Sequence, residues 1–234
     1  SRSEPFERAN ATYPTVIRAF KVPPFDTSAM ADITSKSNGS SLDKTTDINR
    51  QLGSHAAARL LVESLAEHQV QTYRRQSREL VSHFNRERSA VEGYRGRQLL
   101  ELLQNADDAG NVQGDAKLLI DLAGDRLVVA NTGTPFSERG LESLVISDCS
   151  PKQLDRNRFI GCKGLGFRSV LTWTDRPLIS SGALRVAFDM GQALSTIHVL
   201  AENDAALART IREFIDAEGR PPVPIMRFPF VPDE

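Results

Sequence analysis

Three polar residues in one helical pattern have the types and the spacing to do chemistry together. At 100° per residue, Glu101, Asn105 and Asp108 project within about 60° of one another. Asn and Asp are poor helix formers, and Asp107 and Asp108 stand at the C-terminal end, where the helix dipole disfavours negative charge. Leucines cover the opposite side, so the helix buries one face. The polar stripe is therefore either a reaction site or a solvated face that ends near Gly110.

A glycine-rich stretch further along the chain has the composition of an anion-binding loop. Gly161, Gly164 and Gly166, together with Lys163, stand directly before a helical pattern. Glycines let the backbone approach an anion closely, and the start of a helix supplies free N–H donors. The order of the residues matches neither a Walker A loop nor a dinucleotide-binding fingerprint. Taken alone, the stretch could equally be a tight turn before a helix.

Length and composition are those of an ordinary globular chain without a bulk charge. The 234 residues are enough for one large domain or two small ones. A net charge of −1 gives no argument for binding to nucleic acid or to an acidic membrane surface. Cys149 and Cys162 are too few for a disulfide framework, and no apolar run is long enough for a membrane span. We therefore expect no membrane association and a reducing compartment, cytoplasmic or, in a eukaryote, nuclear.

Residues 1–46 are rich in Ser, Thr, Pro, Asn and Asp, and the run 34–41 is typical of a linker. We predict a flexible N-terminal extension over 1–46. Two short apolar pieces within it, 16–20 and 22–25, could add an edge strand, dock on a partner or be a remnant of cloning. The sequence leaves these three interpretations open.

Residues 47–88 follow a helical period and are dense in arginine. Glutamates interleave with the arginines, which favours a solvated, ion-paired face over a face that contacts nucleic acid. A capping box from Ser89 to Glu92 predicts the start of the next helix there, or nearer Arg95. The helix with the polar stripe would follow directly.

The rest of the chain combines paired strand-like runs with helical patterns. The runs that we expect to form two hairpins are 116–122 with 126–130, and 177–181 with 184–188. A short helix should begin after Ser137, and another should cover 204–217. Residues 223–230 predict a proline-interrupted edge strand. This order favours an α+β fold, with helices covering one face of a mostly antiparallel mixed sheet.

Taken together in chain order, three motifs resemble the ATP-binding domain of the GHKL superfamily, which has the histidine-kinase-like ATPase fold, a two-layer sandwich. The motifs are Glu101-Leu-Leu-Gln-Asn-Ala-Asp-Asp-Ala-Gly110, Asn131-Thr-Gly-Thr-Pro-Phe136 and Gly164-Leu-Gly-Phe-Arg-Ser-Val170. Arg176-Pro-Leu-Ile-Ser-Ser-Gly182 continues the likeness. The sequence is most similar to the sacsin-type branch of heat-shock-chaperone-like ATPases, and the resemblance covers roughly residues 94–230.

The resemblance implies a role for each matching residue. Asn105 would coordinate Mg²⁺, and Glu101 would be the general base that activates the attacking water. Asp108, Asn131 and Gly133 would lie near the adenine and ribose. The residues implied to hold the phosphates of ATP are Gly161, Lys163, Gly164 and Gly166, and residues 147–160 would form a lid.

Two departures from the family pattern weaken the expectation of turnover. Asn131 stands where many relatives carry an Asp that accepts a hydrogen bond from adenine; an amide oxygen can accept this bond but lacks the charge. Relatives also carry a Thr on a late strand, whereas positions 224–226 here are Pro, Ile and Met. Altered base recognition and slow hydrolysis are the expected consequences.

The function implied is Mg²⁺-dependent ATP binding, with slow hydrolysis that drives lid closure in a larger chaperone-like or defence and remodelling protein. Residues 47–234 would be the ATP-binding domain, with leading helices over 47–92. Further domains of the same chain, a second copy, and a client protein or nucleic acid would be its partners. The alternative is a non-hydrolysing nucleotide-sensing or protein-interaction module. A histidine kinase is disfavoured, because no histidine lies in a recognisable phosphoacceptor motif.

Overall fold

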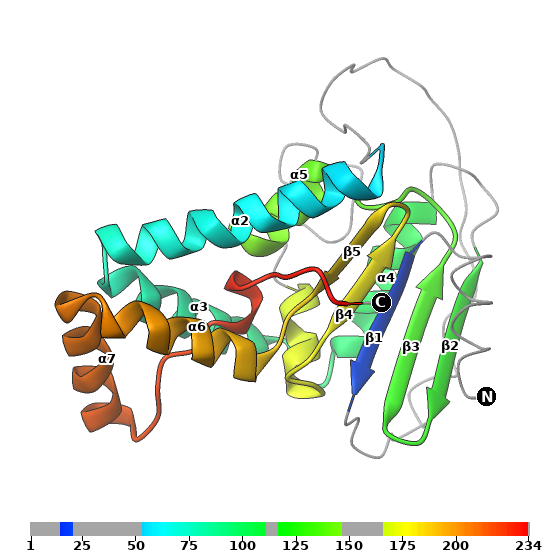
Figure 1. Cartoon of the computed structure of the whole chain (residues 1–234). Helices are drawn as coiled ribbons and strands as arrows, with labels where there is room; N and C mark the ends of the chain where they lie inside the picture. The colour runs from blue at the N-terminus through cyan, green and yellow to red at the C-terminus, as the bar shows by residue number, and fades with distance from the viewer. Residues whose placement is uncertain (1–14, 21–52, 111–116, 147–165, 234) are drawn as a thin grey trace.

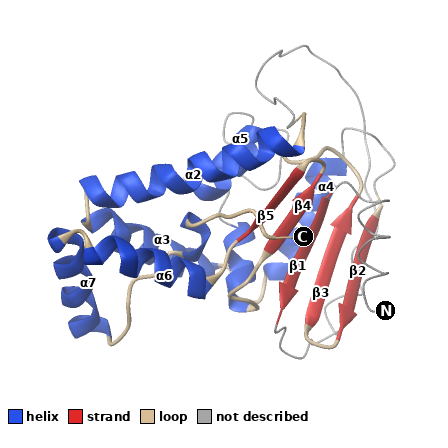
Figure 2. Cartoon of the chain, in the orientation of Figure 1, coloured by secondary structure: helices blue, strands red, loops and turns tan. Residues whose placement is uncertain are grey.

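The computed structural model describes residues 15–20, 53–110, 117–146 and 166–233, and over 15–20 it describes the side chain of Ile17 alone. The described chain has the α+β composition that the sequence predicts (Figure 2). Its strands are β1 (Thr15–Phe20), β2 (Leu118–Ala123), β3 (Arg126–Asn131), β4 (Leu178–Ser181) and β5 (Leu184–Ala187). Its α-helices are α2 (His55–Arg75), α3 (Arg78–Gly93), α4 (Gln98–Gly110), α5 (Glu138–Val145), α6 (Met190–Glu202) and α7 (Ala205–Glu218). Two 3₁₀ helices are η3 (Gly166–Thr172) and η4 (Ile225–Arg227).

The five strands form one sheet in the order β2-β3-β1-β4-β5, and all its pairs are antiparallel (Figure 1). Both predicted hairpins are confirmed. Gly124 at the tip of the first and Gly182 at the tip of the second have φ values of +63° and +57°. These angles are costly for residues with a Cβ, which explains the glycine in each two-residue turn.

Strand β1 lies in the middle of the sheet, hydrogen-bonded to β3 on one side and to β4 on the other. The prediction of a flexible extension over 1–46 is therefore wrong for 15–20, and the alternative of an edge strand is wrong for the piece 16–20. The piece 22–25 lies outside the described residues. Apolar alternation over six residues is the same for an edge and a central strand, because position in a sheet depends on partners distant in the sequence.

A single row of apolar residues crosses all five strands. The register aligns Ile120, Val129, Ile17, Ile179 and Val186. All five belong to the core or pack against it. Because the side-chain period of a strand is two, this row defines the core-facing side of the sheet.

The helical pattern predicted over 47–88 is divided between α2 and α3. The break lies at Gln76 and Ser77, and the hydroxyl of Ser77 lies 2.9 Å from the hydroxyl of Thr210 on α7. The predicted helix start between Ser89 and Arg95 is wrong. Since α3 runs on through Gly93, Ser89 lies within its last turns, and α4 begins only at Gln98.

The predicted helix after Ser137 and the predicted helix over 204–217 are confirmed as α5 and α7, and local hydrogen bonds define their ends. The Ser137 hydroxyl accepts a hydrogen bond from the Gly140 N–H at the start of α5. The Asp204 carboxylate caps α7, and Gly219 ends it in the left-handed conformation. Helix α6 was not predicted, although its N-cap, Asp189, accepts a hydrogen bond from the Gln192 N–H in the usual manner.

The predicted edge strand over 223–230 is wrong, because the segment contains the 3₁₀ helix η4. Its only strand-like pairing is an isolated bridge between Phe230 and Ala187 on β5. Prolines at 221 and 222 precede the segment, and prolines at 224 and 229 interrupt it. Each proline lacks an N–H donor, which prevents a regular ladder.

The helices lie in two groups around the sheet. In Figure 1, α4 lies behind the sheet, whereas α2, α3, α6 and α7 gather beyond its β5 end. Helix α4 contacts β3 and η3, and α2 contacts β5. Leu102 of α4 shares the core with Leu127 and Val129 of β3. The fold thus brings the predicted polar helix directly beside strand β3 and the end of the glycine motif.

Candidate functional site

Helix α4 carries the predicted polar stripe, and the protein buries much of it. The exposed fractions of Glu101 and Asp108 are 8% and 5%, while Asn105 is partly exposed and the neighbouring Asp107 is exposed. Burial of a carboxylate costs free energy unless polar groups surround it. The interpretation of the stripe as a solvated face therefore does not hold for Glu101 and Asp108.

The turn after β3 packs against the C-terminal end of α4. The Thr134 N–H donates to the carbonyl of Ala109 at 3.0 Å. Gly133 has a φ of +131°, and a Cβ there would lie 2.5 Å from the Ala109 oxygen and 3.0 Å from the Gly110 nitrogen. Gly133 therefore allows close approach of the turn to the α4 backbone, whereas the family resemblance implied close approach to a base.

Asn131, the last residue of β3, lies just before this turn and is buried, with 6% of its surface exposed. Its Nδ2 donates to the carbonyl of Thr132 at 3.1 Å, which orients the amide. The Thr132 hydroxyl in turn accepts a hydrogen bond from the Lys117 N–H at 2.7 Å. The bond to the Thr132 carbonyl fixes the orientation of the Asn131 amide, whose oxygen and NH₂ group are not interchangeable.

The end of the glycine motif contacts the other end of the polar stripe. Gly166 begins η3, and a Cβ on Gly166 would clash with Oε2 of Glu101 and lie 2.8 Å from its Cδ. The side chains of Gln98 and Thr172 join the same two helices through a hydrogen bond of 2.7 Å. The Ser169 hydroxyl donates to the Gly166 carbonyl at 2.6 Å and stabilises the first turn of η3.

Parts of all three motifs therefore meet along one helix. Glu101 at one end of α4 lies against Gly166, and Ala109 at the other end lies against Gly133. Eight residues separate these contacts, or about 12 Å along the axis. Asn105 and Asp108 lie between them on the same face. Phe167, by contrast, packs into the hydrophobic core.

The predicted phosphate-binding residues Gly161, Lys163 and Gly164 lie outside the described residues. The segment 147–160, predicted as a lid, lies outside them as well.

Two neighbours of Glu101 were not anticipated from the sequence. Burial raises the pKa of Tyr94, and the negative charge of Glu101 raises it further, which places the phenol within the electrostatic reach of this carboxylate. The Arg97 guanidinium lies 6.0 Å from the centre of the Tyr94 ring. Arg97 is one helical turn before Glu101, a spacing that periodicity could have identified.

A buried polar cluster was also missed, and it lies at the junction of α3, η3, η4 and α5. Its charged members are Glu87, Arg168 and Arg227, with exposed fractions of 6%, 1% and 2%. Isolated Glu and Arg residues in helical patterns usually face solvent. The sequence therefore offered no signal for this cluster, because its members come from segments far apart in the chain.

The donor set fits the implied magnesium ion in one respect. Asn105 is a hard oxygen ligand that is partly exposed, and Mg²⁺ usually keeps water and phosphate oxygens as further ligands. Among the described residues, no group of three or more His, Cys, Asp or Glu side chains could hold a metal ion by itself.

A hollow of about 360 Å³ lies away from the polar stripe, between α2, α6 and the C-terminal segment. It is lined in part by Arg59, Glu63, Thr196 and Phe228, and none of the predicted site residues lines it. Arg59 and Glu63 form an exposed ion pair at 2.8 Å. This hollow gives no support to the candidate site.

No α-helix in the described ranges combines the length and the apolar character that crossing a membrane requires. Comparison of the chain with protein-family models, with curated proteins and with solved structures finds no match in any of the three.

Proposed function

We propose that this chain is a GHKL-type ATP-binding domain that requires Mg²⁺ and hydrolyses ATP slowly within a larger chaperone-like or remodelling protein. The contact between Gly166 and Glu101 carries the proposal. It joins the end of a motif suited to phosphates to a buried carboxylate suited to activating water. Two segments 65 residues apart in the chain have no local reason to meet in this way.

The contact between Gly133 and Ala109 supports one orientation of the nucleotide along α4. Gly133 and Asn131 lie at the C-terminal end of α4, and Gly166 lies near its N-terminal end. The adenine would lie toward Asn131 and Asp108, and the phosphates toward Glu101. Gly161, Lys163 and Gly164 would complete the phosphate contacts.

We extend the proposal to the fold. The antiparallel sheet with α4 behind it would be the two-layer sandwich of the histidine-kinase-like ATPases (Figure 1). The remaining helices beyond β5 would be an elaboration of that fold. The family resemblance of the three motifs supplies the reason for this assignment.

The proposed chemistry needs few groups. The Glu101 carboxylate accepts a proton from the water that attacks the terminal phosphorus, while the bond from that phosphorus to the bridging oxygen of ADP breaks. Asn105 would hold Mg²⁺, which supplies neutralisation of the phosphate charge when bound. Because Glu101 is buried against Gly166, its carboxylate stays at the end of α4 where Gly166 lies.

Calorimetry with Mg-ATP and a turnover assay on the purified protein test the proposal. Glu101→Ala should retain ATP binding and lose turnover, and Asn105→Ala should weaken Mg-ATP binding. Asp107→Ala, an exposed neighbour on the same helix, is the matched control and should resemble the wild type. A folded protein that gives no heat with Mg-ATP or Mg-ADP would refute the proposal.

A non-hydrolysing nucleotide-binding module is the second candidate. It is favoured by Asn131 in place of an acid and by η4 in place of a late strand with Thr. The same assays separate the two candidates. Binding without turnover above that of Glu101→Ala would select the non-hydrolysing module.

A further inference from the structure

The two outer strands of the sheet, β2 and β5, differ in what lies along their outer edges. At β5, the C-terminal segment pairs with the edge. The Ala187 N–H donates to the Phe230 carbonyl at 2.9 Å, and the Phe230 N–H donates to the Ala187 carbonyl at 3.0 Å. At β2, no strand among the described ranges pairs with the outer edge (Figure 1). Within the described part of the chain, the sheet is therefore covered at β5 and open at β2.

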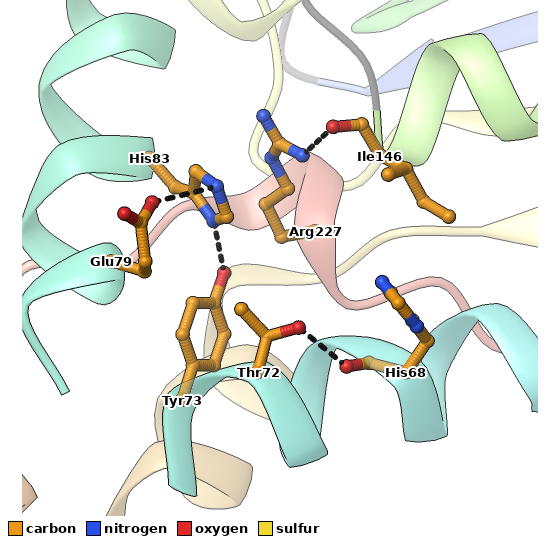
Figure 3. A network of polar contacts seen from close by, with 7 residues as sticks. All are labelled: His68, Thr72, Tyr73, Glu79, His83, Ile146 and Arg227. Carbon is orange, nitrogen blue, oxygen red and sulfur yellow. Dashed lines mark hydrogen bonds and ion pairs between the residues drawn. The ribbon is translucent and has the colours of Figure 1, made fainter. Parts of the chain in front are cut away.

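Buried polar contacts hold the C-terminal segment that covers β5. Oε1 of Glu87 on α3 accepts a hydrogen bond from the Ile225 N–H at 2.7 Å, and Oε2 accepts one from the Met226 N–H at 2.9 Å. The next residue, Arg227, donates to the carbonyl of Ile146, which caps the end of α5 (Figure 3). Because these bonds tie η4 to two different helices, the β5 edge is closed to another strand.

The backbone groups of β2 point alternately toward β3 and toward the outer edge, as in any antiparallel pair. The Thr132 N–H donates to the Lys117 carbonyl at 2.9 Å, and the Lys117 N–H donates to the Thr132 hydroxyl at 2.7 Å. Lys117 and the odd-numbered residues after it therefore direct their backbone groups toward β3. The groups of Leu118, Ile120 and Leu122 point outward, and they offer another strand three donors and three acceptors.

The side chains of β2 combine an apolar row with two opposite charges. Leu118 and Leu122 have exposed fractions of 42% and 48%, and Ile120 between them packs against the core. Charged side chains on an edge strand commonly prevent pairing with another chain. Here Lys117 and Asp121 differ in sign and stand four residues apart, on the side of the sheet away from Ile120. This spacing makes the strand complementary to an antiparallel copy of itself.

Charge selects one register for such a pair. Positions 117 and 121 are equally distant from Leu119, so a two-fold axis beside Leu119 places Lys117 of each copy opposite Asp121 of the other. Opposite charges in this position stabilise a strand pair. An axis beside Asp121 would instead oppose two carboxylates, and an axis beside Ile120 would leave both charges without an opposite partner.

The same register satisfies the backbone. With the axis beside Leu119, Leu118 of each copy pairs with Ile120 of the other, and the apolar row continues across the boundary. Both residues direct their N–H and C=O groups outward, so the two pairs make four hydrogen bonds. The bonds between β2 and β3 stay intact.

We propose that β2 binds β2 of a second copy of this chain, antiparallel about a two-fold axis beside Leu119, so that the two sheets join into one. The contact is strand addition at a sheet edge, and it uses the same surface on both copies. A strand edge is smaller than a standard stable interface, so we expect a weak dimer with a Kd of about 50 µM. The dimer does not depend on nucleotide binding.

Sedimentation equilibrium of the whole chain, from about 5 µM to about 300 µM, tests the proposal because this range brackets the expected Kd. The wild type should show a monomer–dimer equilibrium. Asp121→Lys opposes two cations and Lys117→Asp opposes two anions, so each variant alone should have a Kd raised at least about tenfold. An equimolar mixture of the two variants should associate as tightly as the wild type, because each position 117 then faces an opposite charge at position 121.

Asp216→Lys is the matched control, since it makes the same change of charge at an exposed position on α7. It should keep the Kd of the wild type. A wild type that stays monomeric over the whole range would overturn the proposal, and would mean that this chain or another protein covers β2. Dimers that persist in both single variants would place the interface elsewhere. A mixture that associates no better than its components would refute the antiparallel register.

Proline substitution tests the backbone contacts separately from the charges. Leu118→Pro removes an N–H that points away from β3, at the first residue of an outer strand, where proline is tolerated. This variant should keep the circular dichroism spectrum of the wild type and lose the dimer. Leu119→Pro removes an N–H that points toward β3, so it should destabilise the fold itself. A folded Leu118→Pro variant with the Kd of the wild type would contradict the proposal.

Discussion

Gly166 and Glu101 approach so closely that a Cβ on Gly166 would lie 2.8 Å from Cδ of Glu101 and 3.1 Å from its Cγ. Gly166 does not have a positive φ, so space alone requires glycine here. By contrast, Gly133 at the other end of α4 is required both by its φ of +131° and by its contact with Ala109. These two glycines therefore allow different tests.

Gly166→Ala should impair the site more than the fold. The added methyl group would push the Glu101 carboxylate or η3 aside, at a cost of about 1–3 kcal/mol in the free energy of unfolding. Turnover should fall to the level of Glu101→Ala, because the carboxylate loses its position. Gly93→Ala is the control, since a Cβ there meets no atom within 4 Å. Denaturant unfolding and the turnover assay measure the two effects; a Gly166→Ala variant with wild-type stability and turnover would contradict the described contact.

Gly133→Ala should separate the turn after β3 from the end of α4. Its cost combines backbone strain with overlap on the Ala109 carbonyl, and together these should exceed about 2 kcal/mol. Gly124→Ala measures the cost of a left-handed φ without a clash, because Gly124 has a φ of +63° and open space around it. We expect about 1 kcal/mol for Gly124→Ala. Equal losses for the two variants in thermal or denaturant unfolding would show that the contact with α4 contributes nothing.

The stability of the protein should fall as the pH rises from about 4.5 to about 7, through Glu87. Burial raises the pKa of Glu87 to about 7 from an ordinary value of 4.5. Between these values the folded protein keeps a proton that the unfolded chain releases, so the unfolded state gains stability with pH. The difference corresponds to about 3 kcal/mol, and it stays constant above pH 7.

The free energy of unfolding of Glu87→Gln minus that of the wild type gives this contribution, since other titrating groups cancel. This difference should become more positive as the pH rises through the window. Glu92→Gln should give a difference that is flat with pH, because Glu92 is exposed. A flat difference for Glu87→Gln would mean that Glu87 is ionised throughout. The ionised form of Glu87 thus lowers the free energy of unfolding.

The candidate site was predictable from the sequence to the extent that it lies on one helix. Helical periodicity places Glu101, Asn105 and Asp108 on one face, and α4 has this face. Periodicity did not predict that Glu101 and Asp108 are buried, because burial depends on what packs against the helix. It also gave no sign of Glu87, whose partners are Ile225 and Met226.

The sequence by itself determined the features that depend on a few neighbouring residues. The hairpin turns at Gly124 and Gly182, the Ser137 cap and the Gly219 stop follow from local dihedral angles and local hydrogen bonds. Only the tertiary structure decided that Thr15–Phe20 is the central strand, that a glutamate of α3 caps η4, and that Gly166 meets Glu101. These contacts join segments separated by tens of residues or more. Their free energy comes from packing and burial in the assembled core, which short-range spacing does not encode.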